Sequence, residues 1–338
     1  MYAKEKEDLK MISAYAGARS EYVQGGGGNV SVKFDGRLMA IKASGYTLAE
    51  ITAEKGYVTV DYGKIMDYYN TVDPNAGKDY EKESLEVGLN SIELLKGMEE
   101  RRPSVEVGFH SFLSRCVIHT HSVYANLLCC SEEGRDIAKK IFADSSIAYL
   151  FIPYIDPGFR LTLEIRQALL DFESRCGRIP DAIFLDNHGI IVHHANAYWT
   201  VFLHEEINRK ITEYFDLTDY PKPKIRPHAY KSDTPYLIDF IAQNKAYEDY
   251  FNNIRLYPDQ LVYLGGKMGK EIRFYSNELL YFAGEKEAQA MDETILGVAY
   301  VIGAIKKAGL TLRQMDEKGA SFINNWESEK YRKTIIEK

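Results

Sequence analysis

Two histidines, His119 and His121, stand two residues apart in an apolar, β-prone segment at 116–126. Alternate residues of a strand point to the same face, so a strand here would place both imidazoles side by side. Two imidazoles that converge on one point are half of a divalent-metal site, because catalytic zinc takes three protein ligands and keeps one position open. A His-x-His pair is also typical of two solvated histidines, so the metal interpretation needs a third ligand.

His188 offers that third ligand. It follows an apolar run at 182–185 and precedes another at 190–192, which places it in a turn between two predicted strands. A turn at the end of a strand can aim a side chain into a cleft. The sequence therefore predicts a site for zinc or another divalent metal, formed by His119, His121 and His188.

The overall composition excludes several classes of partner. The chain has 338 residues, of which 45% are apolar and 27% charged, as in ordinary globular proteins. Its 42 basic and 49 acidic residues give a net charge of −7, which favours neither nucleic acid nor an anionic membrane surface as a partner. The amino terminus lacks an apolar signal region, and no stretch reaches about 18 apolar residues. We expect a cytoplasmic protein whose four cysteines are reduced.

The order of apolar and polar segments predicts two parts. Strand-like and helix-like segments are interleaved over residues 1–218, which favours an α/β layered domain, with a charged insertion at about 63–102. Residues 219–229 contain three prolines and no periodicity, as expected of a linker. Residues 230–338 are predicted to form a small α+β extension, in which 260–264 is a strand and 287–309 a helix.

Two local features could hold an anion such as phosphate. The four glycines at 25–28 expose backbone N–H groups, because no Cβ stands in the way. Ser44 and Gly45 precede a short helical turn and offer a hydroxyl, an amide and the positive end of a helix dipole. Each feature is equally compatible with an ordinary loop. Neither matches the phosphate-loop or dinucleotide motif, so the sequence does not predict ATP or NAD binding.

Glu106 lies in the first turn of a helix that Pro103 and Ser104 are predicted to start. The simpler interpretation of this glutamate is a residue that complements the helix dipole. Beside a metal it could instead act as a general acid or base. That second role requires a partly closed pocket that raises the pKa of Glu106.

Four motifs in this order resemble the class II aldolase/adducin family, in which fuculose-phosphate and rhamnulose-phosphate aldolases are the familiar enzymes. The resemblance covers roughly residues 8–215. The motifs are Gly28-Asn29-Val30-Ser31-Val32, Ser44-Gly45, Pro103-Ser104-Val105-Glu106, and His119-Thr120-His121-Ser122 together with Asn187-His188-Gly189.

The resemblance implies a zinc-type site in which Glu106 is the acid/base residue near the open position. It also implies a substrate pocket with these members: Asn29, Ser44, Gly45 and Ser104 at the phosphate, with Gly28 and Tyr154 nearby. The family usually has a second serine where Val105 stands here. A hydrogen bond to a charged group contributes about 1.5–3 kcal/mol, so its loss weakens the expected phosphate recognition.

The fold implied by the resemblance is a central, mainly antiparallel sheet flanked by helices. The implied activity is a metal-dependent aldolase that cleaves a ketose 1-phosphate, such as rhamnulose or fuculose phosphate, to dihydroxyacetone phosphate and an aldehyde through a metal-stabilised enediolate. A sugar-phosphate 4-epimerase or dehydratase, or a non-catalytic adducin-like interaction domain, are the alternatives. The family tends to form homotetramers, and the segment after the linker resembles the extension found in two-part rhamnulose-phosphate aldolase/dehydrogenase proteins.

Overall fold

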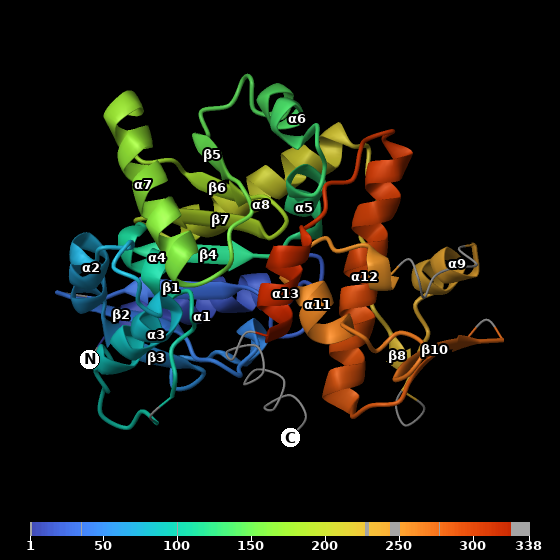
Figure 1. Ribbon diagram of the computed structural model, residues 1–338, viewed down its shortest axis with the longest axis horizontal. Helices are drawn as coiled ribbons and strands as arrows, with labels where there is room; N and C mark the ends of the chain where they lie inside the picture. Colours follow the sequence, from blue (N-terminus) through green and yellow to red (C-terminus); the bar gives the residue numbers. More distant parts are fainter. Residues whose placement is uncertain are drawn as a thin grey trace.

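The computed structural model describes residues 2–34, 36–99, 101–226, 230–243, 251–276 and 278–325. Its centre is a seven-stranded sheet with the order β3-β2-β1-β4-β7-β6-β5 (Figure 1). Neighbouring strands are antiparallel except for β5 and β6, which are parallel. The strands are β1 (Asn29–Lys33), β2 (Leu38–Lys42), β3 (Tyr57–Asp61), β4 (Cys116–Thr120), β5 (Tyr149–Ile152), β6 (Ala182–Leu185) and β7 (Gly189–His194).

Helices cover both faces of this sheet, so every residue of β4 is buried. One layer consists of α1 (Ala3–Gly17), α5 (Val123–Cys129), α6 (Gly134–Ile141) and α8 (Ala197–Tyr214), and the other of α2 (Tyr62–Thr71), α3 (Tyr80–Asn90), α4 (Val107–Phe112) and α7 (Phe159–Cys176). Ile118 packs into the core on the α1 side, whereas Val117 packs on the side of α4 and α7. His119 follows the alternation of Val117 and therefore faces the layer that contains α4.

The C-terminal part packs beside α5 rather than on the sheet itself (Figure 1). It contains α9 (Pro235–Gln243), α11 (Pro258–Leu264), α12 (Glu285–Lys307), α13 (Glu317–Asn325) and a sheet of order β10-β11-β9-β8. The strands of this sheet are β8 (Ile225–Arg226), β9 (Lys231–Ser232), β10 (Ile272–Tyr275) and β11 (Glu278–Tyr281). The long helix α12 lies against α5, α9 and α11, and one apolar core continues from α5 into α12.

One predicted element differs from the observed one, and one agrees with it. The apolar run at 260–264 is part of helix α11 and not a strand, since Pro258 begins a helix there with Asp259 in its first turn. All seven residues of α11 are buried, so its sequence lacks the one-sided pattern that separates a helix from a strand. The expected helix at 287–309 is present as α12.

The predicted fold class is confirmed: a mostly antiparallel sheet between helical layers, with a small α+β region at the C-terminal end. The division of the chain at residues 219–229 stays a prediction. None of the helices in the described ranges combines the length and the apolar character that crossing a bilayer requires.

Candidate metal centre

Three histidines meet at the carboxyl end of β4. His119 is in β4, His121 follows directly after it, and His188 lies in the turn between β6 and β7. That turn is tight because Asn187 adopts the left-handed conformation, with φ of 52°. All three side chains are buried, and one ligand atom from each lies within 4.8 Å of the others. The structure thus brings together the three residues that the sequence selected as metal ligands.

The ring nitrogens of His119 are used in different ways. Its Nδ1 lies 3.1 Å from the carbonyl oxygen of Ile190, which fixes Nδ1 as the donor. Its Nε2 is buried and has no hydrogen-bond partner among the described residues. A buried imidazole nitrogen left as an acceptor beside two further imidazoles is the donor set that zinc prefers. The residues present therefore fit a divalent metal.

Glu106 completes this cluster from the N-terminal end of α4. Its Oε1 lies 3.4 Å from Nε2 of His119 and 3.7 Å from Nε2 of His188. Burial acts to raise the pKa of Glu106, but the facing imidazoles outweigh burial and hold this pKa well below its usual range. The sequence argument required a raised pKa for Glu106, and the structure gives the opposite direction because three imidazoles surround the carboxylate.

Asn29, Ser44 and Ser104 lie close to Glu106. Asn29 is paired with His119 across β1 and β4, and its Nδ2 lies 3.5 Å from Oε2 of Glu106. A bridge between the two chain segments, at residues 43 and 103, brings Ser44 beside Ser104. The hydroxyl of Ser104 accepts a hydrogen bond from the N–H of Glu106 at 3.3 Å. The predicted phosphate-binding side chains thus lie on segments adjoining the histidine cluster.

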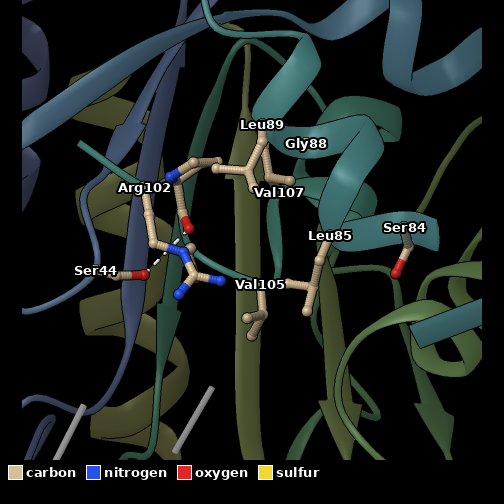
Figure 2. A pocket seen from close by; sticks show the side chains of 10 residues that line it. Ser44, Ser84, Leu85, Gly88, Leu89, Arg102, Val105 and Val107 are labelled. Atoms are coloured by element: carbon tan, nitrogen blue, oxygen red, sulfur yellow. Dashed lines mark hydrogen bonds between the residues drawn. The ribbon is translucent and has the colours of Figure 1, made fainter. Parts of the chain in front are cut away.

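Sequence reasoning missed Arg102, which lines a small hollow with Ser44, Ser104 and Val105. Figure 2 shows its guanidinium between Ser44 and Val105, with α3 forming the opposite wall. Val105 packs against an apolar cluster and offers no hydroxyl. The signal for Arg102 was present, since it directly precedes the Pro103-Ser104 motif, but it was taken as part of the charged insertion.

The N–H groups of Gly25 and Gly26 are already bonded within the protein. Gly25 donates to Glu293 Oε2 at 2.9 Å, and Gly26 donates to the Tyr263 hydroxyl at 2.7 Å. Gly28 has φ of 70°, and a Cβ at this position would lie 2.8 Å from the carbonyl oxygen of His119. Close approach of neighbouring chain segments is a physical reason for these glycines. The place of Gly28 near a substrate phosphate stays a prediction.

Asp259 was not identified from the sequence, and no motif marks it. It lies in α11, its side chain is fully buried, and its Oδ2 makes a very short contact with Nδ1 of His121. Tyr154, which was predicted to line the pocket, lies in the loop after β5. Its ring packs closely against Gly319 of α13, since a Cβ added at Gly319 would lie 2.5 Å from the ring. The pocket role of Tyr154 stays a prediction.

The part of the chain that contains the histidine cluster is similar to known proteins. A description of the "Class II Aldolase and Adducin N-terminal domain" family matches residues 12–214. The "Uncharacterized oxidoreductase YuxG" of Bacillus subtilis (strain 168) is 27% identical over 194 residues, 55% of this chain. Those residues make up only 26% of that protein, so the chain spans about a quarter of the length of this curated relative.

Solved structures are similar in fold. The N-terminal class II aldolase domain of a conserved protein from Thermoplasma acidophilum has 23% identity and a TM-score of 0.51, over 61% of this chain and 92% of that one. An L-fuculose 1-phosphate aldolase has 20% identity and a TM-score of 0.43, over 67% of this chain and 92% of that one. Because the family description spans more than half of the sequence, this protein belongs to the class II aldolase and adducin N-terminal domain family.

Proposed function

We propose that the protein is a divalent-metal-dependent aldolase that cleaves a ketose 1-phosphate, such as rhamnulose or fuculose phosphate, to dihydroxyacetone phosphate and an aldehyde. The observation that carries the proposal is the buried convergence of three imidazoles, with the Glu106 carboxylate against two of them. Membership of the family supports the class of reaction.

The chemistry divides between a cation and this chain's own residues. His119, His121 and His188 would hold zinc or another divalent cation, which would supply a Lewis acid for the oxygens that gain charge when the C–C bond breaks. Breaking that bond leaves its electron pair on the ketone fragment, as an enediolate. In condensation Glu106 takes the proton from the ketone carbon, and a separate tyrosine, as in the family, gives a proton to the aldehyde oxygen. In cleavage that tyrosine takes the proton of the hydroxyl that becomes the aldehyde, and protonated Glu106 gives its proton to the enediolate carbon. A glutamate carboxylate is ionised at neutral pH and can therefore accept that proton in condensation.

Recognition of the phosphate is assigned to Asn29, Ser44, Gly45 and Ser104, with Arg102 added. A guanidinium binds phosphate through charge-assisted hydrogen bonds, which are about twice as strong as neutral ones. Its location in the hollow beside Ser44 and Ser104 would offset the hydroxyl that is missing at Val105. A phosphorylated sugar therefore remains the proposed substrate.

A homo-oligomer, with four copies as in the family, is also proposed. The supporting observation is a group of large apolar side chains on α8 that face solvent: Tyr198, Trp199 and Phe202 are 72%, 54% and 52% exposed. Neighbouring exposed aromatic side chains are typical of surfaces that contact another protein.

The proposed chemistry is tested without knowledge of the aldehyde. The protein is incubated with dihydroxyacetone phosphate in heavy water, and loss of a proton from the hydroxymethyl carbon is followed by NMR. We expect exchange that a chelator stops and added zinc restores. Glu106→Gln should slow the exchange by about 10²–10⁴-fold while metal remains bound, since it removes a general base. Glu164→Gln, at an exposed glutamate of α7, is the matched control and should exchange at the normal rate.

Three outcomes would overturn parts of the proposal. An unchanged exchange rate in Glu106→Gln would remove Glu106 from proton transfer. Absence of exchange in protein that holds metal would exclude this substrate and favour the 4-epimerase or dehydratase alternative, or an unphosphorylated substrate. Purified protein that holds no metal, even after zinc is added, would favour a non-catalytic interaction domain.

A further inference from the structure

We propose that the C-terminal part of the chain is built into the metal centre, and that Asp259 of α11 is the positioning residue for His121. The inference rests on the proposed function, since it takes the histidine cluster as a metal site. It assigns a role to a segment of the chain outside the residues that the family description matches, 12–214.

The contact between Asp259 and His121 selects the metal-binding nitrogen. A carboxylate against Nδ1 makes that nitrogen the proton donor, so the lone pair of the ring is on Nε2. Among the described residues, the group whose ligand atoms are close enough to share one metal ion consists of the three histidines. Asp259 is therefore not a ligand in this group; it contacts the opposite side of the His121 ring. Such carboxylate–histidine pairs fix the tautomer and the direction of a ligand ring, and they make the ring more basic.

His119 shows the same arrangement with a weaker partner. Its Nδ1 is directed to the carbonyl oxygen of Ile190, a backbone group of the family domain. His121 instead depends on a charged side chain 138 residues away in sequence. A charge-assisted hydrogen bond is stronger than one to a carbonyl. The orientation of His121 is therefore supplied by the C-terminal part.

The turn that carries His188 is held from the same direction. The side-chain amide of Asn187 donates to the carbonyl oxygen of Leu256 at 2.8 Å and to that of Arg313 at 3.0 Å. Leu256 lies two residues before α11, and Arg313 lies between α12 and α13. These bonds are independent of Asp259, so two of the three ligands are anchored by the C-terminal part at separate points.

The glycine run is shaped to receive α11. A Cβ at Gly27 would overlap Oδ2 of Asp259 and would lie 3.0 Å from Nδ1 of His121. A Cβ at Gly25 would meet the ring of Tyr263, which is also in α11, at 2.8 Å. Side chains at these positions would push α11 away from His121. The unusual run of glycines thus has a physical reason that belongs to the metal centre.

The decisive experiment measures metal affinity rather than turnover. Zinc affinity of the 338-residue chain carrying Asp259→Asn is determined by competition with a chromogenic chelator. We expect binding weaker by about 10–100-fold than in the wild type, the usual effect of losing an outer-shell partner. The visible spectrum of the cobalt(II)-loaded protein should also change, because the ring of His121 is no longer held in one orientation.

Two further variants make the result specific. Asp292→Asn is the matched control: Asp292 is equally buried in α12, but it accepts hydrogen bonds from Tyr281 and Thr234, away from the histidines. It should leave zinc affinity and the cobalt spectrum unchanged. Asn187→Gly keeps the left-handed backbone conformation while removing both amide bonds. It should weaken zinc binding even if Asp259→Asn does not fold.

The outcomes separate this inference from the proposed function. Wild-type protein that binds neither zinc nor cobalt would overturn the metal centre, and with it the proposed function. If the wild type binds metal and the Asp259 and Asn187 variants bind it equally well, only the role of the C-terminal part is wrong. An equal loss of affinity in Asp292→Asn would also overturn that role, because loosened packing alone would then explain the effect.

Discussion

Gly27 lies against the contact between Asp259 and His121, where the structure has no space for a side chain. Replacing it by alanine inserts a methyl group between Asp259 and His121, so either the carboxylate or the imidazole has to move. Overpacking of this kind typically destabilises a protein by about 1–3 kcal/mol. We expect Gly27→Ala to lower both the free energy of unfolding and the zinc affinity, measured by urea denaturation and chelator competition.

Making the same Gly27→Ala change in the Asp259→Ala variant tests whether the close approach of Asp259 causes the destabilisation. In Asp259→Ala the carboxylate is absent, so the added methyl group at residue 27 has space and should cost much less than in the wild type. Gly284→Ala is the control, because a Cβ there would meet nothing within 4 Å. Equal costs of Gly27→Ala in both backgrounds would contradict the close approach that we describe.

At the scale of single residues, the sequence predicted the metal ligands but not the residues that orient them. His119, His121 and His188 could be found because strand alternation and a turn between two apolar runs restrict where their side chains point. Asp259 could not, because its partner is 138 residues distant and the apolar residues that follow it resemble a strand. The direction of the pKa shift of Glu106 was also beyond reach, since it depends on how closely three imidazoles approach one carboxylate.

At the scale of elements, one-sided helices and alternating strands of the first 215 residues were predictable because half of each element faces another layer. The fully buried helix α11 was not predictable in this way. In α11 every residue is buried, so the apolar pattern carried no period. The same limit explains why the sequence could not decide between an anion-binding loop and an ordinary loop for the glycine run. Nothing in the run indicates that a helix of the C-terminal part lies against it.

Helix α3 provides a prediction about an element, because Gly88 weakens it without a packing reason. A Cβ at Gly88 would lie 3.4 Å from Val107 and 3.7 Å from Pro103, both ordinary van der Waals distances. Alanine is a better helix former than glycine by up to about 1 kcal/mol. Gly88→Ala should therefore raise the free energy of unfolding by about 0.5–1 kcal/mol in urea denaturation.

The matched change in α12 should have the opposite sign. A Cβ at Gly297 would lie 3.0 Å from the Tyr257 hydroxyl and 3.3 Å from the side chain of Gln24, in a buried environment where neither can easily move. Gly297→Ala should destabilise the protein despite the same gain in helix propensity. Stabilisation by both substitutions would show that α12 is packed less tightly than the structure indicates.

At the scale of the whole molecule, the described parts share one interior. The apolar core that contains α12 includes side chains of α5, β6 and β7, so the histidine cluster is enclosed by residues from both ends of the chain. An interior of this kind also holds uncharged histidines that are not among the three expected metal ligands. Burial lowers the pKa of three of them to about 3: His110, His193 and His204.

These histidines make stability depend on pH in a direction that can be worked out. The unfolded chain takes up protons near pH 6.5, whereas the native state stays neutral at these sites until about pH 3. Between these values the unfolded state binds more protons, so stability falls as the pH falls. Glu81 acts against this trend, because burial raises its pKa to about 7 and its native state holds a proton that the unfolded state releases.

One histidine can be isolated from these opposing effects. His193 lies with Nδ1 2.9 Å from the Ser114 hydroxyl, and the Lys33 ammonium nearby further disfavours its charged form. His193→Gln removes one titrating group and leaves Glu81 unchanged. From pH 7.5 to 5.5, wild type should lose about 1.4 kcal/mol more free energy of unfolding than this variant, the effect of one fully depressed histidine pKa. Urea denaturation of both proteins at the two pH values gives this difference directly. Equal losses in the two proteins would mean that His193 is protonated in the folded state.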